Sequence, residues 1–139
     1  KRPRILAGDN VSTLAVLQHA LKKVKADIVV VLQATSPIRR DGLIDDCIRE
    51  FRKSKADSLA TGFICKYLPY GSGNKRRQDI KGFFYDDGNI YVIKADLIRR
   101  GKRFGKKIKQ VLLDKKGNID IDDDFDFQIA EQVLLKKIR

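Results

Sequence analysis

The sequence has few of the residues on which many catalytic and metal sites depend. Its 139 residues include one histidine, two cysteines, and neither methionine nor tryptophan. Cys47 and Cys65 lack zinc-ligand spacing and lie in apolar patterns, which favours buried free thiols in a reducing cytosol. His19 lies in a helical pattern, where a structural role is expected. The sequence therefore shows neither a histidine-containing catalytic triad nor a zinc centre.

The sequence also lacks membrane-spanning segments, a signal-peptide core and the common phosphate-binding loops. No apolar run is long enough to span a membrane, and the first residues do not form the apolar core of a signal peptide. There is no G-x-x-x-x-G-K-[ST] phosphate loop and no G-x-G-x-x-G fingerprint. Because the chain starts at Lys1 and contains no methionine, we expect a fragment of a longer protein. Without a membrane span or a signal peptide in the sequence, we expect that protein to be cytoplasmic and to have no membrane partner.

The charge is strongly positive and unevenly placed. A net charge of +12 arises from 30 lysines and arginines against 18 aspartates and glutamates. Such a balance favours anionic partners, among them nucleotides, acidic sugars and nucleic acids. Basic residues crowd Lys75 to Arg77 and Arg99 to Lys109, whereas Asp114 to Asp126 is acidic. A non-catalytic nucleic-acid-binding module is therefore an alternative, although such a module has no obvious need for the acidic block.

Apolar patterns alternate between strand and helix periods. The predicted strands cover residues 27–32, 58–65, 89–94 and 110–113, and the predicted helices cover 13–24, 43–53, 95–100 and 124–138. The run Asp27 to Leu32 is continuous and β-branched, which is typical of a central strand in a parallel sheet. We therefore predict one α/β domain over residues 1–139, with a mostly parallel sheet flanked by helices.

The loop after the first predicted strand is one candidate site. In open α/β sheets, ligands bind beyond the carboxyl ends of the strands. The segment Gln33 to Arg39 begins at such an end and offers an amide, two hydroxyls and a guanidinium. These groups suit the hydroxyls and carboxylate of a sugar acid. A plain strand-to-helix connection, with Thr35 or Ser36 capping locally, explains the same residues equally well.

The acidic block contains the second candidate site. In Asp120-Ile121-Asp122 a strand period of two places both carboxylates on one face. Two carboxylates that meet phosphate oxygens are suitable ligands for Mg²⁺. The alternative is that these aspartates end a strand and cap the following helix. The metal interpretation requires the acidic pair to lie on the same side of the molecule as Gln33.

Four stretches, in order, resemble the acylneuraminate cytidylyltransferase family, which includes the CMP-sialic acid synthetases. They are Arg2-Pro3 with Asp9 to Leu21, Leu32 to Arg39 (LQATSPIR), Arg77 to Tyr91 ending in DGNIY, and Asn118 to Glu131 (NIDIDDDFDFQIAE). The second and fourth stretches are the most specific. The resemblance implies a three-layer nucleotide-diphosphosugar-transferase fold and a homodimer. It also implies a Mg²⁺-dependent reaction of CTP with a nine-carbon sugar acid, which yields a CMP-sugar and pyrophosphate.

The resemblance also implies roles for individual residues. Asp120 and Asp122 match the metal-binding aspartates. The sugar contacts match Gln33, Arg77, Tyr91 and Phe104, and the segments that border cytidine contain Arg2, Val11 and Thr13. The residues that would carry the reaction are therefore Asp120, Asp122, Gln33 and Arg77.

Several departures from the family pattern leave the sugar and the dimer open. The phosphate loop of the family is missing, so the chain alone is expected to be inactive. Ala34 replaces a proline, DGNIY stands where NGAIY is typical, and Arg103 occupies one of two aromatic positions. The stretch from Lys66 to Arg77 is shorter than the dimer arm of bacterial sialic acid enzymes. An eight-carbon acid such as Kdo is the alternative substrate.

Overall fold

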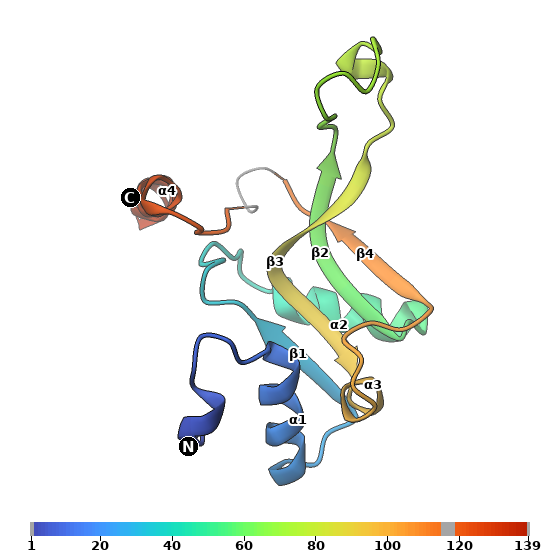
Figure 1. Cartoon of the computed structure of the whole chain (residues 1–139), viewed down its shortest axis with the longest axis vertical. Coiled ribbons are helices and arrows are strands. Elements are labelled where there is room, and N and C mark those ends of the chain that lie inside the picture. The colour runs from blue at the N-terminus through green and yellow to red at the C-terminus, as the bar shows by residue number, and fades with distance from the viewer. Residues whose placement is uncertain (1, 115–118, 139) are drawn as a thin grey trace.

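A four-stranded sheet with the order β1-β3-β2-β4 forms the centre of the chain (Figure 1). The computed structural model describes residues 2–114 and 119–138. The strands are β1 (Ile28–Leu32), β2 (Ser58–Cys65), β3 (Phe83–Lys94) and β4 (Ile108–Leu112). The helices are α1 (Thr13–Lys23), α2 (Leu43–Ser54), α3 (Ala95–Arg99) and α4 (Asp124–Ile138), with short 3₁₀ turns at Arg4–Leu6 and Arg77–Asp79. None of these described helices is long and apolar enough to cross a membrane.

The sheet is mixed. β3 pairs antiparallel with both β1 and β2, and β2 pairs parallel with β4. Strands β1, β2 and β4 therefore share one direction, and β3 runs against them between β1 and β2. The predicted α/β class is confirmed, but the antiparallel direction of β3 was not predicted. A strand buried on both faces has the same apolar sequence whichever way it runs.

The predicted helices are present with nearly the predicted bounds. The Oγ of Ser12 accepts a hydrogen bond from the Ala15 amide at 3.3 Å and so caps α1. At the other end of the chain, α4 begins at the predicted Asp124. Of the fourth stretch of the resemblance, Asn118 lies outside the described residues.

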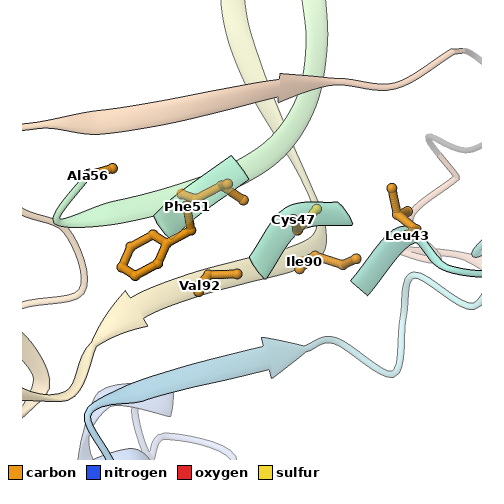
Figure 2. Packing of buried hydrophobic residues seen from close by; sticks show 7 residues of the cluster. Leu43, Cys47, Phe51, Ala56, Ile90 and Val92 are labelled. Atoms are coloured by element: carbon orange, nitrogen blue, oxygen red, sulfur yellow. The ribbon is translucent and has the colours of Figure 1, made fainter. Parts of the chain in front are cut away.

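One face of the sheet is closed by α2. Leu43, Cys47 and Phe51 project from α2 onto the sheet (Figure 2). The rest of this buried cluster consists of Ala56, Leu59, Ile90 and Val92. Burial raises the pKa of the Cys47 thiol to about 11, so this side chain remains a neutral apolar group near pH 7. Cys47 and Cys65 are both buried and free, as predicted.

The opposite face is only partly covered. Val31 and Ile93 pack against Leu97 and Ile98, which both lie on α3. Helix α1 adds three leucines to this cluster: Leu14, Leu17 and Leu21. These helices cover β1 and the lower half of β3 (Figure 1). On β4, Ile108 and Leu112 remain exposed, so this part of the sheet is open.

An irregularity interrupts the pairing of β2 with β3. Ala60 pairs with Tyr91 and Gly62 pairs with Asp86, so residues 87–90 lie opposite Thr61 alone. The Oγ1 of Thr61 accepts a hydrogen bond from the Ile90 amide at 2.9 Å and donates one to Asp87 Oδ1 at 2.6 Å. The same Asp87 oxygen accepts the Asn89 amide at 3.0 Å. This β3 bulge, residues 87–90, interrupts the pairing with β2 and places a tight turn against the loop after β1, while Ile90 stays paired with Leu32 of β1.

Candidate active site

A cavity of about 790 Å³ lies where β1 ends, and it contains both sequence-predicted site segments. Gln33 and Thr35 line it from the loop after β1, and Asp120 and Asp122 line it from the segment before α4. Its other lining residues are Phe63, Cys65, Tyr67, Phe84, Tyr85, Asp86, Asp87, Gly88, Tyr91 and Asp126. A cavity of this size is in the range of small-ligand sites. The acidic pair therefore lies on the same side of the molecule as Gln33.

Direct hydrogen bonds join the two segments. The amide of Ile121 donates to the Thr35 carbonyl at 2.8 Å. The Oγ of Ser36 lies 3.1 Å from Asp120 Oδ1 and 3.0 Å from the Asp87 carbonyl oxygen. Arg39 donates to the Gln33 carbonyl at 2.8 Å and to the Asn89 carbonyl at 3.2 Å, which fixes the path of the loop. The carboxylate of Asp120 is thus held against a buried, well-connected loop.

The acidic segment is not a strand. Residues 119–123 have no regular secondary structure, so the period-two argument does not explain why Asp120 and Asp122 share a cavity. Contact with the loop after β1 explains it instead. The alternative prediction, that aspartates of this segment cap the following helix, applies to Asp123. Its Oδ1 accepts a hydrogen bond from the Asp126 amide at 2.9 Å. Asp126 Oδ2 in turn accepts the Asp122 amide at 3.2 Å, which leaves the Asp122 side chain exposed at the cavity.

Asp120 and Asp122 offer carboxylate oxygens, the type of ligand that Mg²⁺ prefers. Within residues 2–114 and 119–138 there is no group of three or more histidine, cysteine or acidic side chains arranged around a metal position. Mg²⁺ commonly binds proteins through one or two carboxylates and completes its shell with water and phosphate oxygens. A Cβ added at Gly88 would lie 3.2 Å from Asp120 Oδ2. The glycine therefore leaves space beside this carboxylate that a larger residue would fill.

Aromatic residues form the other wall of the cavity. Tyr91 donates its hydroxyl hydrogen to Asp86 Oδ1 at 2.5 Å, and burial together with this bond raises the pKa of Tyr91. Tyr91 therefore remains a protonated donor. The guanidinium of Arg103 lies over its ring at 5.1 Å. Tyr91, Asp86 and Phe84 also line a second cavity of about 300 Å³, which includes Phe104.

The remaining predicted site residues lie outside the main cavity. Arg77 lies over the ring of Tyr67 at 5.5 Å, and Tyr67 lines the cavity. Phe104 lies in the second cavity with Tyr91. In the described part of the chain, the candidate cytidine residues Arg2, Val11 and Thr13 are not among the lining residues. One chain therefore brings together Gln33, Tyr91, Asp120 and Asp122, but not the whole predicted set.

Of the two acidic residues of β3, sequence reasoning noted Asp87 only as part of the departure DGNIY, and it missed Asp86. Asp86 and Asp87 line the cavity, and Asp87 is nearly fully buried with Oδ2 unpartnered among the described residues. Burial raises the pKa of Asp87, and its bonds from Thr61 and Asn89 oppose this effect. The available signal was the dipeptide Asp87-Gly88, a turn signal between two apolar stretches. It marks the β3 bulge.

The chain resembles known proteins in sequence. No family model matches the chain. It is 26% identical to post-translational flagellin modification protein B of Campylobacter coli, over 99% of this chain and 68% of that protein. It is also 25% identical to N-acylneuraminate cytidylyltransferase A of Danio rerio, over 98% of this chain. The chain is thus similar in sequence to proteins that include an N-acylneuraminate cytidylyltransferase.

The two sequence relatives support the predicted resemblance to cytidylyltransferases, and a solved structure shows the same fold. The crystal structure of 4-diphosphocytidyl-2C-methyl-D-erythritol synthase from Anaerococcus prevotii DSM 20548 superposes with a TM-score of 0.63. The identity is 15%, and the match covers 91% of this chain and 68% of that chain, so it supports the nucleotidyltransferase fold alone. The chain spans 36% of the Danio rerio cytidylyltransferase.

Proposed function

We propose that the protein containing this chain transfers a cytidylyl group from CTP to a nine-carbon, sialic-type sugar acid. The products are a CMP-sugar and pyrophosphate. The observation that carries the proposal is the shared cavity of Gln33, Asp120 and Asp122. The sequence similarity to an N-acylneuraminate cytidylyltransferase supports the choice of nucleotide and sugar class.

In this proposal Asp120 and Asp122 hold Mg²⁺. When bound, such an ion offsets negative charge on the triphosphate and on the departing pyrophosphate. Asp120 is fixed by its hydrogen bond from Ser36, whereas Asp122 is exposed and free to turn toward a phosphate-bound ion. The two aspartates thus differ in mobility, and Asp120 is the better-defined ligand.

The other residues of the cavity bind and orient the sugar acid. Gln33 offers an amide, Thr35 a hydroxyl, and Tyr91 an aromatic face whose hydroxyl is engaged with Asp86. We propose that these groups direct the anomeric hydroxyl toward the α-phosphorus of CTP. A new bond forms between that oxygen and the phosphorus, the bond to the bridging oxygen of pyrophosphate breaks, and the proton of the hydroxyl passes to water. Such positioning needs little acid–base chemistry, in keeping with a cavity lining without histidine among the described residues.

A homodimer is part of the proposal. The connection between β2 and β3 extends away from the sheet and carries exposed Tyr67, Leu68 and Tyr70 (Figure 1). Exposed apolar side chains gathered on one projection are typical of a contact surface. Arg77 lies on the same projection. We propose that it, together with Phe104 and the cytidine-bordering Arg2, Val11 and Thr13, completes the site in the cytoplasmic full-length dimer.

The test is pyrophosphate release by the full-length protein, supplied with CTP, Mg²⁺ and single sugar acids. We expect release with N-acetylneuraminate and a roughly 10³-fold lower kcat/KM in Asp122→Ala, because metal-assisted charge stabilisation contributes several kcal/mol. Asp45→Ala, an exposed aspartate on α2, is the matched control and should retain wild-type activity.

Three outcomes would contradict the proposal. Release that survives in Asp122→Ala would refute the metal assignment. Release with Kdo but with no nine-carbon acid would reassign the substrate. Tight RNA or DNA binding with a steep salt dependence, and no release at all, would favour the nucleic-acid-binding alternative that the net charge of +12 suggests.

A further inference from the structure

Ser36 occupies an unusual position between the acidic segment and the β3 bulge. It is fully buried, with 0% of its surface exposed, although it lies in a loop. Its Oγ is 3.1 Å from Asp120 Oδ1 and 3.0 Å from the Asp87 carbonyl oxygen, so one hydroxyl hydrogen is shared between two acceptors. A hydrogen bond to a carboxylate is stronger than one to a neutral acceptor. Asp120 thus has a donor that cannot turn away into solvent.

Gly88 limits the position of the same carboxylate from another direction. Its φ of +69° is a backbone conformation that residues with a side chain rarely adopt. A Cβ at this position would lie 3.0 Å from Ser36 Oγ and 3.2 Å from Asp120 Oδ2. The backbone of the β3 bulge therefore approaches both the donor and its acceptor, and only glycine allows this approach.

The loop that carries Ser36 is itself fixed by buried contacts. Asn89, which is 1% exposed, donates from Nδ2 to the Ile38 carbonyl at 2.9 Å. On the other side of Ser36, the Thr35 carbonyl accepts the Ile121 amide at 2.8 Å. Three segments far apart in the sequence therefore meet at Asp120: the loop after β1, the β3 bulge and the approach to α4.

From this geometry we infer that Ser36 is a positioning residue for Asp120, and that Gly88 keeps the adjacent space open for a divalent cation. The inference rests on the proposed function, because it assumes that Asp120 is a metal ligand. Hydrogen bonds to the ligands of a metal fix their orientation, and their loss commonly lowers metal affinity 10- to 100-fold. The hydroxyl of Ser36 selects one orientation of the carboxylate before the cation arrives.

The experiment measures Mn²⁺ binding to the full-length protein by the loss of the free-ion EPR signal. Ser36→Ala should weaken Mn²⁺ binding about 10-fold or more, and should raise the Mg²⁺ concentration for half-maximal pyrophosphate release by a similar factor. Gly88→Ala should change both quantities in the same direction, because its methyl group presses on Asp120. Ser54→Ala removes a hydroxyl that bonds to the Phe51 carbonyl at the end of α2, away from the acidic segment, and is the matched control.

A purely structural role for Ser36 would give a different result. Thermal unfolding identifies a temperature at which every variant is folded, and Mn²⁺ affinity is compared there. If Ser36→Ala is less stable but binds Mn²⁺ with wild-type affinity, the inference is overturned while the proposed function stands. If Asp122→Ala also binds Mn²⁺ like the wild type, the metal assignment fails, and the inference fails with it.

Discussion

The two faces of the sheet differ in how completely they are covered, and this difference separates stability from function. On one face, α2 buries a continuous apolar cluster that includes Cys47, Phe51 and Ile90. On the other face, α1 and α3 cover β1 and the lower half of β3 but leave two cavities around Tyr91. The closed face supplies the hydrophobic core, and the open face supplies polar and aromatic groups. Changes on the two faces should therefore have different consequences.

The largest expected effect on stability is on the closed face. Phe51 is 4% exposed, and Phe51→Ala should lower the free energy of unfolding by about 3–5 kcal/mol, because it leaves a cavity in the core. Phe104→Ala is the matched control on the open face, where the ring is 68% exposed and the expected change is about 0.5 kcal/mol. Urea unfolding measures both values. Equal losses of unfolding free energy in the two variants would show that the closed face does not contribute more to stability than the open face.

On the open face, one substitution should lower stability only slightly and yet weaken substrate binding. The guanidinium of Arg103 lies 5.1 Å from the centre of the Tyr91 ring. Arg103→Ala should cost only about 0.5–1 kcal/mol of stability, the usual value of such a contact. Its KM for the sugar acid should nevertheless rise, because Tyr91 lines both cavities. Lys102→Ala removes a neighbouring exposed charge and should change neither quantity, and an unchanged KM in Arg103→Ala would contradict the prediction.

The smallest expected effect is a pH dependence at the β3 bulge. Burial raises the pKa of Asp87 in the folded state above its unfolded value near 3.9. The folded state therefore holds this proton more tightly, so Asp87 stabilises the fold below its unfolded pKa and loses that contribution as the pH rises through its folded pKa. Asp87→Asn does not titrate there. The stability of the wild type relative to this variant should fall from about pH 3 upward.

Chemical denaturation of both proteins at several pH values measures this difference. The other carboxylates are common to the two proteins, so their pH-dependent contributions to stability largely cancel in the comparison. A difference that is constant, or that grows in favour of the wild type with rising pH, would show that the pKa of Asp87 is not raised in the folded protein.

Much of the fold could be predicted from local sequence patterns. Ser12 precedes α1 as a typical N-cap, and the apolar run of β1 is unmistakable, because both signals depend only on neighbouring residues. The direction of β3 and its bulge could not be predicted in this way. The direction depends on pairing with β1 and β2, and the bulge depends on Thr61, which bonds to both Asp87 and Ile90 from another strand.

The candidate site was predictable in part for the same reason. Gln33 follows a buried strand, and Asp120 and Asp122 stand out as a pair, so local composition identified both segments. The contact of Ser36 with Asp120, 84 residues apart, has no local signal. Arg77 matched a family position in sequence, yet its place on the projecting connection depends on how the chain assembles.

The β3 bulge also divides one strand into two parts with different neighbours. Ile90 to Lys94 pairs with β1, and Tyr91 to Ile93 also pairs with β2, whereas Phe83 to Asp86 pairs with β2 alone. Between these parts, hydrogen bonds of the Thr61 and Asp87 side chains join the two strands in place of a regular ladder. The shape of the cavity wall therefore depends on two polar side chains rather than on backbone pairing.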